Sequence, residues 1–132
     1  MALVRFGDIA VEWSRVYALV RSFATDEEHP FTEPVEVYAD FPDADLSKPF
    51  IRLSVPAHRN AIWAYAKDDG RFTEFDGVLL DMSRVGIVAR TEDGKQANVM
   101  FLLPDGRSAT VRVTPDLAGL ILASISTARR PA

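Results

Sequence analysis

Alternation of apolar and polar residues predicts short β-strands along most of the chain. The clearest case is residues 35–41 (VEVYADF), where every second residue is apolar, so we expect one face of this strand to be buried. Near the start, Leu3–Phe6 is apolar and Gly7-Asp8 follows as a two-residue hairpin turn. The other predicted strands cover residues 9–11, 16–20, 50–55, 97–103 and 108–113, with two further apolar runs on either side of Ser83-Arg84.

Two helices are predicted, each opened by a proline. Pro56 begins the first, which Asp68-Asp69-Gly70 ends with a glycine in the usual C-terminal place. The second follows Thr114-Pro115, with threonine as the N-cap, proline at the first helical position and arginines at its C-terminal end. A helix over residues 9–23 is an alternative to strands there. We favour strands because the matching stretch later in the chain carries Gly86 in its interior, where glycine weakens a helix.

The chain contains one sixteen-residue pattern twice. FGDIAVEWSRVYALVR, residues 6–21, aligns with FDGVLLDMSRVGIVAR, residues 75–90, at an offset of 84 − 15 = 69 positions. The identical pairs are Phe6/Phe75, Ser14/Ser83, Arg15/Arg84, Val16/Val85 and Arg21/Arg90. Because the later predicted elements also recur in the same order, we predict an internal duplication with repeat one at residues 3–70 and repeat two at residues 72–130.

The expected fold is a single α+β domain over residues 1–132. Two tandem ββββα repeats give about eight mostly antiparallel strands and two helices, related by a pseudo-twofold axis. The pattern leaves open whether the strands form a continuous sheet, two packed sheets or a barrel.

Composition narrows the class of protein. The 132 residues are 48% hydrophobic and 26% charged, an ordinary globular balance, and the net charge of −4 argues against nucleic-acid binding. There is no cysteine, the N-terminal stretch lacks the apolar core of a signal peptide, and no apolar run is long enough to cross a bilayer. We therefore expect a soluble cytoplasmic protein that does not bind a membrane.

Candidate catalytic chemistry is sparse. The two histidines, His29 and His58, fall in a proline-flanked loop and at a helix start, and no nucleophile-elbow, zinc-protease or phosphate-loop motif is present. The acidic residues around Asp40-x-x-Asp43-x-Asp45 lack the glycine and closing glutamate of a calcium-binding loop, and we expect them to be solvated. We predict a non-enzymatic protein with no metal and no cofactor.

Asp81-x-Ser83-x-x-Gly86 resembles the D-x-S-x-x-G signature of PilZ domains. That resemblance implies a small β-barrel that binds cyclic di-GMP. PilZ domains pair the signature with an upstream R-x-x-x-R arm, whereas Arg52 and Arg59 stand seven residues apart in this chain. In element order, the second repeat is also similar to LytTR-type DNA-binding domains and to small flagellar FlbD-like proteins, but it lacks the basic surface that a LytTR function requires.

Four arginines are the candidate ligand-binding residues. Arg15, Arg84, Arg21 and Arg90 occupy equivalent places in the two repeats, so near a pseudo-twofold axis they would converge on one anion or nucleotide. The alternative is that they are solvated strand-end charges paired with the acidic residues at positions 12 and 81.

Four large aromatic residues lie outside the clear core pattern: Trp13, Trp63, Tyr65 and Phe31. They serve either in core packing or as anchors for a protein partner, since such residues dominate interface energetics. The leading functional hypothesis is a protein-binding or self-assembling module, expected to form a homo-oligomer. The alternative is a regulatory domain that binds a small ligand or nucleotide between the repeats.

Overall fold

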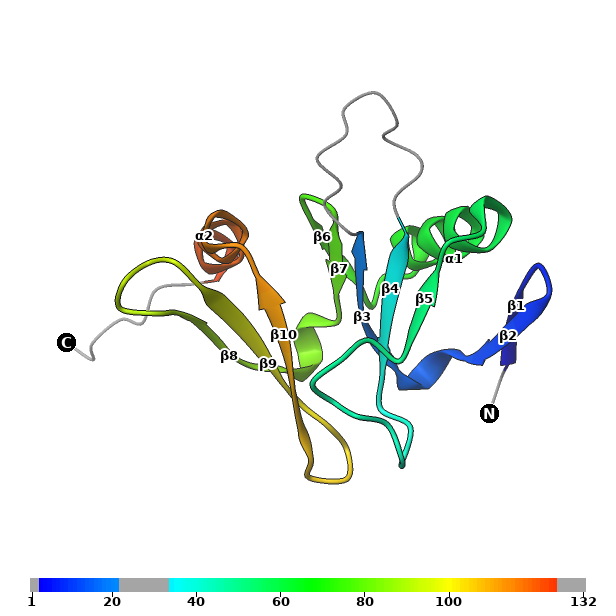
Figure 1. Cartoon of the computed structure of the whole chain (residues 1–132), viewed down its shortest axis with the longest axis horizontal. Helices are drawn as coiled ribbons and strands as arrows, with labels where there is room; N and C mark the ends of the chain where they lie inside the picture. The colour runs from blue at the N-terminus through cyan, green and yellow to red at the C-terminus, as the bar shows by residue number, and fades with distance from the viewer. Residues whose placement is uncertain (1–2, 22–33, 126–132) are drawn as a thin grey trace.

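The computed structural model describes residues 3–21 and 34–125, which form ten β-strands, two α-helices and two 3₁₀ turns (Figure 1). Every strand pairing among these residues is antiparallel. The predicted α+β class is therefore confirmed, with ten strands in place of about eight.

The elements of the first half are β1 (Leu3–Phe6), β2 (Ile9–Glu12), η1 (Trp13–Arg15), β3 (Val16–Arg21), β4 (Val35–Ala39), β5 (Ile51–Leu53) and α1 (Pro56–Asp68). Those of the second half are β6 (Thr73–Phe75), β7 (Val78–Leu80), η2 (Met82–Arg84), β8 (Val85–Arg90), β9 (Ala97–Leu102), β10 (Ser108–Val113) and α2 (Pro115–Ser124). The 3₁₀ turns η1 and η2 begin 82 − 13 = 69 residues apart, the offset of the sequence match. Each turn separates two strands, which is why each half has five strands in place of four.

The strands form three sheets, and this settles an arrangement that the sequence pattern left open. One sheet has two strands, β1-β2, one has three, β10-β9-β8, and one has five, β5-β4-β3-β7-β6. The five-stranded sheet combines both halves, because the β6–β7 hairpin of the second half pairs with β3 of the first through Ala18↔Leu80, Leu19↔Leu79 and Val20↔Val78. The sheets therefore do not divide where the two halves of the sequence divide.

The β6–β7 hairpin closes with a two-residue turn at Asp76-Gly77. Asp76 has φ 27° and Gly77 has φ 83°, and positive φ at both central residues is typical of the tight turns that match the twist of paired strands. Such turns favour Asp-Gly because aspartate tolerates this conformation and glycine adopts it without steric cost.

The five-stranded sheet lies between two apolar layers. On one face, α1 and the β1–β2 hairpin pack against strand residues such as Leu19 and Val37. On the other face, the three-stranded sheet and α2 pack against Tyr17, Tyr38 and Leu80. Strand β4 is thus buried on both faces, so the expectation of a single buried face was wrong: Tyr38 is 7% exposed because the second half covers it.

Both helices begin as predicted. Pro56 and Pro115 are the first residues of α1 and α2, and the Thr114 hydroxyl accepts a hydrogen bond from Leu117 N at 3.1 Å. Helix α2 ends at Ser124, so the arginine-rich end predicted for it lies outside the described residues. Among the residues that the structure describes, neither helix is long and apolar enough to cross a membrane.

Candidate functional site

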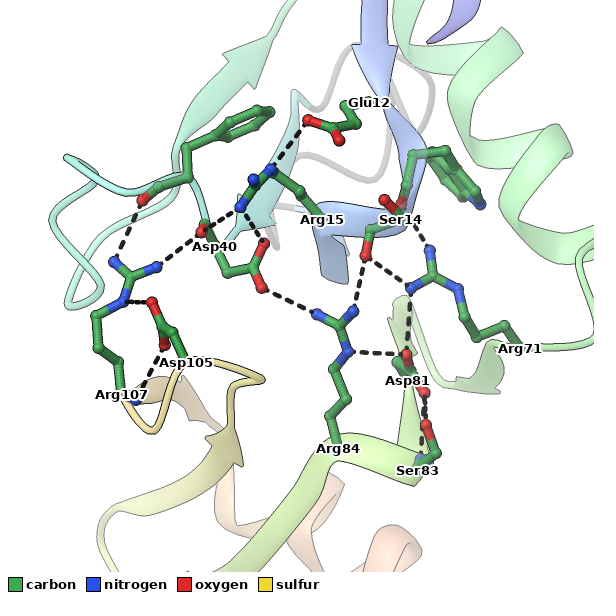
Figure 2. Close-up of polar contacts among 12 residues, drawn as sticks. Glu12, Ser14, Arg15, Asp40, Arg71, Asp81, Ser83, Arg84, Asp105 and Arg107 are labelled. Atoms are coloured by element: carbon green, nitrogen blue, oxygen red, sulfur yellow. Dashed lines mark hydrogen bonds and ion pairs between the residues drawn. The ribbon is translucent and has the colours of Figure 1, made fainter. Parts of the chain in front are cut away.

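A pocket of about 330 Å³ opens where the two halves meet, between the two 3₁₀ turns, the end of β4 and the β9–β10 turn. The residues that line it are Glu12, Ser14, Arg15, Asp40, Arg84, Pro104 and Asp105. Figure 2 shows the ion pairs and hydrogen bonds around this pocket, which we call the arginine–carboxylate network.

Asp81 fixes the second 3₁₀ turn. Its carboxylate accepts hydrogen bonds from Ser83 N at 3.2 Å and from the Ser83 hydroxyl at 2.6 Å, which caps η2. The Asp81 side chain is 1% exposed, and its other oxygen lies 3.3 Å from Arg71 Nη1 and 3.6 Å from Arg84 Nε. The D-x-S stretch thus has a local structural role, as the cap of a turn. The cyclic di-GMP binding that the PilZ resemblance implies remains a prediction.

Arg84 connects the two halves. Its Nη2 donates to Ser14 O of η1 at 2.7 Å, and its Nη1 lies 3.4 Å from Asp40 Oδ2 at the end of β4 (Figure 2). Because Asp40 and Ser14 belong to the first half, one guanidinium bridges η1, β4 and η2. Charge-assisted hydrogen bonds of this kind are shorter and stronger than neutral ones, so Arg84 fixes the relative position of the halves.

Arg71 holds the first 3₁₀ turn from the side opposite to the pocket. Its Nη2 donates to Trp13 O at 2.8 Å and its Nη1 to Ser14 O at 3.5 Å, while the guanidinium stacks 4.6 Å from the Phe72 ring. These bonds satisfy carbonyl groups that a short 3₁₀ turn leaves without partners.

Asp40 is the central carboxylate, and the expectation that it would be solvated was wrong. It is 5% exposed, with Arg15 Nη1 at 3.7 Å on one side and Arg84 on the other. Arg107 of the β9–β10 turn donates to Asp40 O at 2.8 Å and pairs with Asp105. The second half thus covers the end of β4, which is why a strand-end acid becomes buried and paired.

The network as a whole carries little positive charge. Each of its four arginines, at positions 15, 71, 84 and 107, has a carboxylate oxygen within 4 Å. Two buried carboxylate oxygens, Glu12 Oε1 and Asp40 Oδ1, have no hydrogen-bond partner. The pocket between the halves therefore offers acceptors to a ligand more readily than it offers free cations.

Asp69 links this region to the aromatic core. Trp13 Nε1 donates to Asp69 Oδ2 at 2.6 Å and Arg71 N donates to its other oxygen at 3.1 Å. Partial burial of this carboxyl raises its pKa, but the two hydrogen bonds and the charge of Arg71 together hold the pKa of Asp69 below its usual value.

The structure brings together two of the four predicted ligand-binding arginines. Arg15 and Arg84 meet at Asp40 and line the same pocket. Arg21 and Arg90 lie at the opposite ends of β3 and β8. Arg21 stacks 4.3 Å from the Trp63 ring, and Arg90 lies close to α2, where a Cβ placed on Gly119 would be 3.3 Å from its Nη2.

The predicted partner-binding aromatic residues lie mostly in the core. Trp13 is 7% exposed and Trp63 is 6% exposed, and both belong to the layer beneath α1. Tyr65 is 41% exposed and packs edge-to-face on Trp13 at 5.0 Å. Phe31 lies outside the described residues. Burial accounts for the two tryptophans by packing and leaves Tyr65 as the aromatic residue of this group with accessible surface.

Sequence reasoning missed Asp40, Arg71 and Arg107 as members of the network. Arg71 and Arg107 contact backbone carbonyl groups 58 and 67 residues away, at Trp13 and Asp40, and no local pattern signals such contacts. The i,i+3 pairs were foreseeable, because Arg15–Glu12 at 2.9 Å and Arg84–Asp81 at 3.6 Å follow the spacing of a single 3₁₀ turn.

A second surface feature is the free edge of β8. This strand is the last of its sheet, and among the described residues it pairs only with β9. The equivalent strand β3 pairs on both sides, and its Ala18 is fully buried. Ile87, 69 positions after Ala18, is 53% exposed. An apolar strand with one unpaired edge is a template for pairing with another chain.

Comparison with known proteins yields no family. No family model matches the chain, and neither the curated proteins nor the solved structures contain a match. Residues 3–21 and 34–125 also contain no group of three or more His, Cys, Asp or Glu side chains placed to hold a metal ion.

Proposed function

We propose that this protein is a non-enzymatic, self-assembling module, and that copies associate through the β8 edge. The observation that carries the proposal is the contrast between β3 and β8. The two strands have matching sequences, VYALVR and VGIVAR, yet residues 16–19 of β3 are fully buried between two neighbours while β8 exposes Ile87 and leaves one edge unpaired. Pairing that edge would bury apolar surface and satisfy backbone groups at once.

An internal duplication is part of this proposal. Its support is the recurrence of β-β-3₁₀-β-β-β-α in both halves, and the constant offset of 69 residues from the first strand pair to β3 and β8. A duplicated unit that completes its sheet with a hairpin from the next unit leaves one unit with an unfilled edge. That unit is the second half of this chain.

The proposal is tested by the mass of the protein in solution. Light scattering after size exclusion, across a wide concentration range, is expected to give a dimer or larger species for the natural sequence. Ile87→Lys places a charge on the β8 edge and is expected to yield monomers, because a buried unpaired charge in the interface is costly.

Leu120→Lys is the matched control, since Leu120 on α2 is 50% exposed and lies away from the strand edge. It is expected to associate like the natural sequence. A natural sequence that stays monomeric at every concentration contradicts the proposal, and so does equal loss of association in both variants.

Small-ligand binding in the pocket between the halves is a second candidate function. It is favoured by the two unpartnered carboxylate oxygens, Glu12 Oε1 and Asp40 Oδ1, both on residues that line the pocket. Because the neighbouring guanidinium groups are already paired, this pocket suits an amine or guanidine compound better than a nucleotide. Thermal-shift measurements with both compound classes test it: amines or guanidines should raise the unfolding temperature, and Glu12→Gln should reduce the effect.

A further inference from the structure

The position that β3 occupies inside the chain shows what the β8 edge lacks. Strand β3 lies beside β7, and its Ala18 and Val20 pack in the same apolar layer as Val99, Phe101 and Val111 of the three-stranded sheet. Two sets of residues thus form a seat for β3: the hairpin strand alongside it and the sheet face below it.

The first half contains the counterparts of those seat residues. In the second half the register joins Val88 to Val99 and Val99 to Val111, and in the first half it joins Leu19 to Val37 and Val37 to Ile51. Since Leu19 and Val88 are 69 residues apart, Val37 corresponds to Val99 and Ile51 to Val111. By the pairs Val16↔Ala39 and Val85↔Phe101, Ala39 corresponds to Phe101.

These counterparts line an apolar groove of about 340 Å³. Its residues are Ile9, Ala10, Val11, Val37, Ala39, Phe41, Phe50 and Ile51. Ile9 and Val11 of β2 correspond to Val78 and Leu80 of β7, at the offset of 69, so the groove has the same two walls as the seat of β3. Within the described residues no strand lies on the outer edge of β2, and Phe50 at the groove is 49% exposed.

We infer that this groove receives β8 of a second copy of the chain. The inference rests on the proposed self-assembly and names both surfaces of the contact. Transfer of the β3–β7 register by 69 residues pairs β8 of one copy with β2 of the next through Ile87↔Val11, Val88↔Ala10 and Ala89↔Ile9. The exposed Ile87 then enters an apolar groove, as Ala18 does inside the chain.

The same transfer assigns the backbone hydrogen bonds. Inside the chain, Asp81 N donates to Tyr17 O at 3.0 Å and Arg21 N donates to Gly77 O at 2.9 Å. Between copies, Glu12 N would donate to Gly86 O and Arg90 N to Asp8 O. Gly86 and Arg90 are exposed residues of β8, and alternation of an antiparallel ladder directs their backbone groups away from β9.

The contact must join different copies, because the two surfaces lie at opposite ends of one molecule. Figure 1 shows the β1–β2 hairpin at one end of the long axis and the sheet that contains β8 at the other. Each copy therefore offers β8 to one neighbour and its groove to another. Such a head-to-tail contact closes into a ring or extends as a chain.

Complementation of two interface variants tests the inference. Ile87→Lys removes the inserting strand and leaves the groove intact, whereas Ile51→Lys changes the groove and leaves β8 intact. Ile51 is 37% exposed, so lysine is compatible with the fold. Each variant alone is expected to be monomeric by light scattering. An equimolar mixture is expected to show about twice the monomer mass, since one intact contact remains.

Association of Ile51→Lys to the same extent as the natural sequence, with Ile87→Lys monomeric, would overturn the inference while leaving self-assembly through β8 in place. A monomeric natural sequence would instead contradict the proposed function itself. The two failures are therefore distinguishable in one set of measurements.

Cysteine pairs test the register, in a chain that has no cysteine of its own. Ile9→Cys and Ala89→Cys proteins are mixed and oxidised mildly, and the control mixture replaces the first with Ala10→Cys. A one-residue slip turns the side chain to the other face of the sheet, so the first mixture should give at least about 5-fold more mixed dimer than the control. Equal yields from the two mixtures would overturn the register.

Discussion

Removal of the Tyr17 hydroxyl should make the protein more stable. Tyr17 is fully buried between the five-stranded sheet and the second half, with its ring 4.8 Å from that of Phe101, and its hydroxyl has no hydrogen-bond partner. A buried polar group without a partner costs about 1–3 kcal/mol, whereas the lost packing of one oxygen costs less. Tyr17→Phe should therefore raise the free energy of unfolding by about 1 kcal/mol, or the unfolding temperature by roughly 3–5 °C.

Tyr38 provides the matched control. It is nearly as buried, but its hydroxyl donates to Glu36 Oε2 at 3.3 Å. Tyr38→Phe should lower the free energy of unfolding by about 0.5–1 kcal/mol because a made hydrogen bond is lost. Urea unfolding at one fixed protein concentration, followed by circular dichroism, measures both variants. Opposite signs support the reasoning, and a Tyr17→Phe protein less stable than the natural sequence by more than about 0.5 kcal/mol would refute it.

Alkaline pH gives an independent check on the same hydroxyl. Burial, with the charge of Asp40, raises the pKa of Tyr17 to about 12. A folded-state pKa above the unfolded value of about 10 gives stability that is complete below pH 10 and is lost as the pH rises towards 12. The natural protein should thus lose stability between pH 10 and 12 more steeply than Tyr17→Phe, so the difference between them should widen over that range.

Two further predictions concern the surroundings of the pocket. Because the pKa of Asp69 is lowered in the folded protein, its contribution to stability is present above the unfolded pKa of about 4 and is lost as the pH falls through the folded value. Asp69→Asn should therefore show a shallower loss of unfolding temperature below pH 4; an unchanged acid profile would contradict the role of its contact with Trp13. Arg84→Ala should lower the free energy of unfolding by about 2–3 kcal/mol in urea titrations, since it leaves Asp40 and Asp81 under-compensated. Arg84→Lys should recover only part of that loss, because lysine cannot reproduce the guanidinium fork, and full recovery would show that charge alone suffices.

The local parts of this fold could be predicted from the sequence because their signals are local. The Asp76-Gly77 turn, the prolines that open both helices and the Thr114 cap each involve neighbouring residues. The offset of 69 residues between the two matching stretches is also the offset between the two 3₁₀ turns. Periodicity and turn chemistry operate within a few residues, so they identify elements and their order.

The partition into sheets could not be predicted in the same way. The apolar run Val78–Leu80 indicates a strand buried on both faces, but it contains nothing that selects β3 as its neighbour over β8. The pocket shows the same division: Arg15 and Glu12 pair within one turn, whereas the burial of Asp40 depends on a second half that arrives more than forty residues later. Long-range pairing is decided by the whole layer and not by the strand.

The β6–β7 hairpin also sets the order in which the chain becomes a folded protein. A nascent chain that ends at residue 70 contains β3 with one open edge, and the faces of Tyr17 and Tyr38 that the second half covers are exposed to water. The first half acquires its last sheet partner only when residue 80 has been synthesised, and its second apolar layer only after α2. During synthesis the chain therefore passes through a long interval in which an apolar strand edge is open, and premature pairing between neighbouring nascent chains becomes the principal hazard.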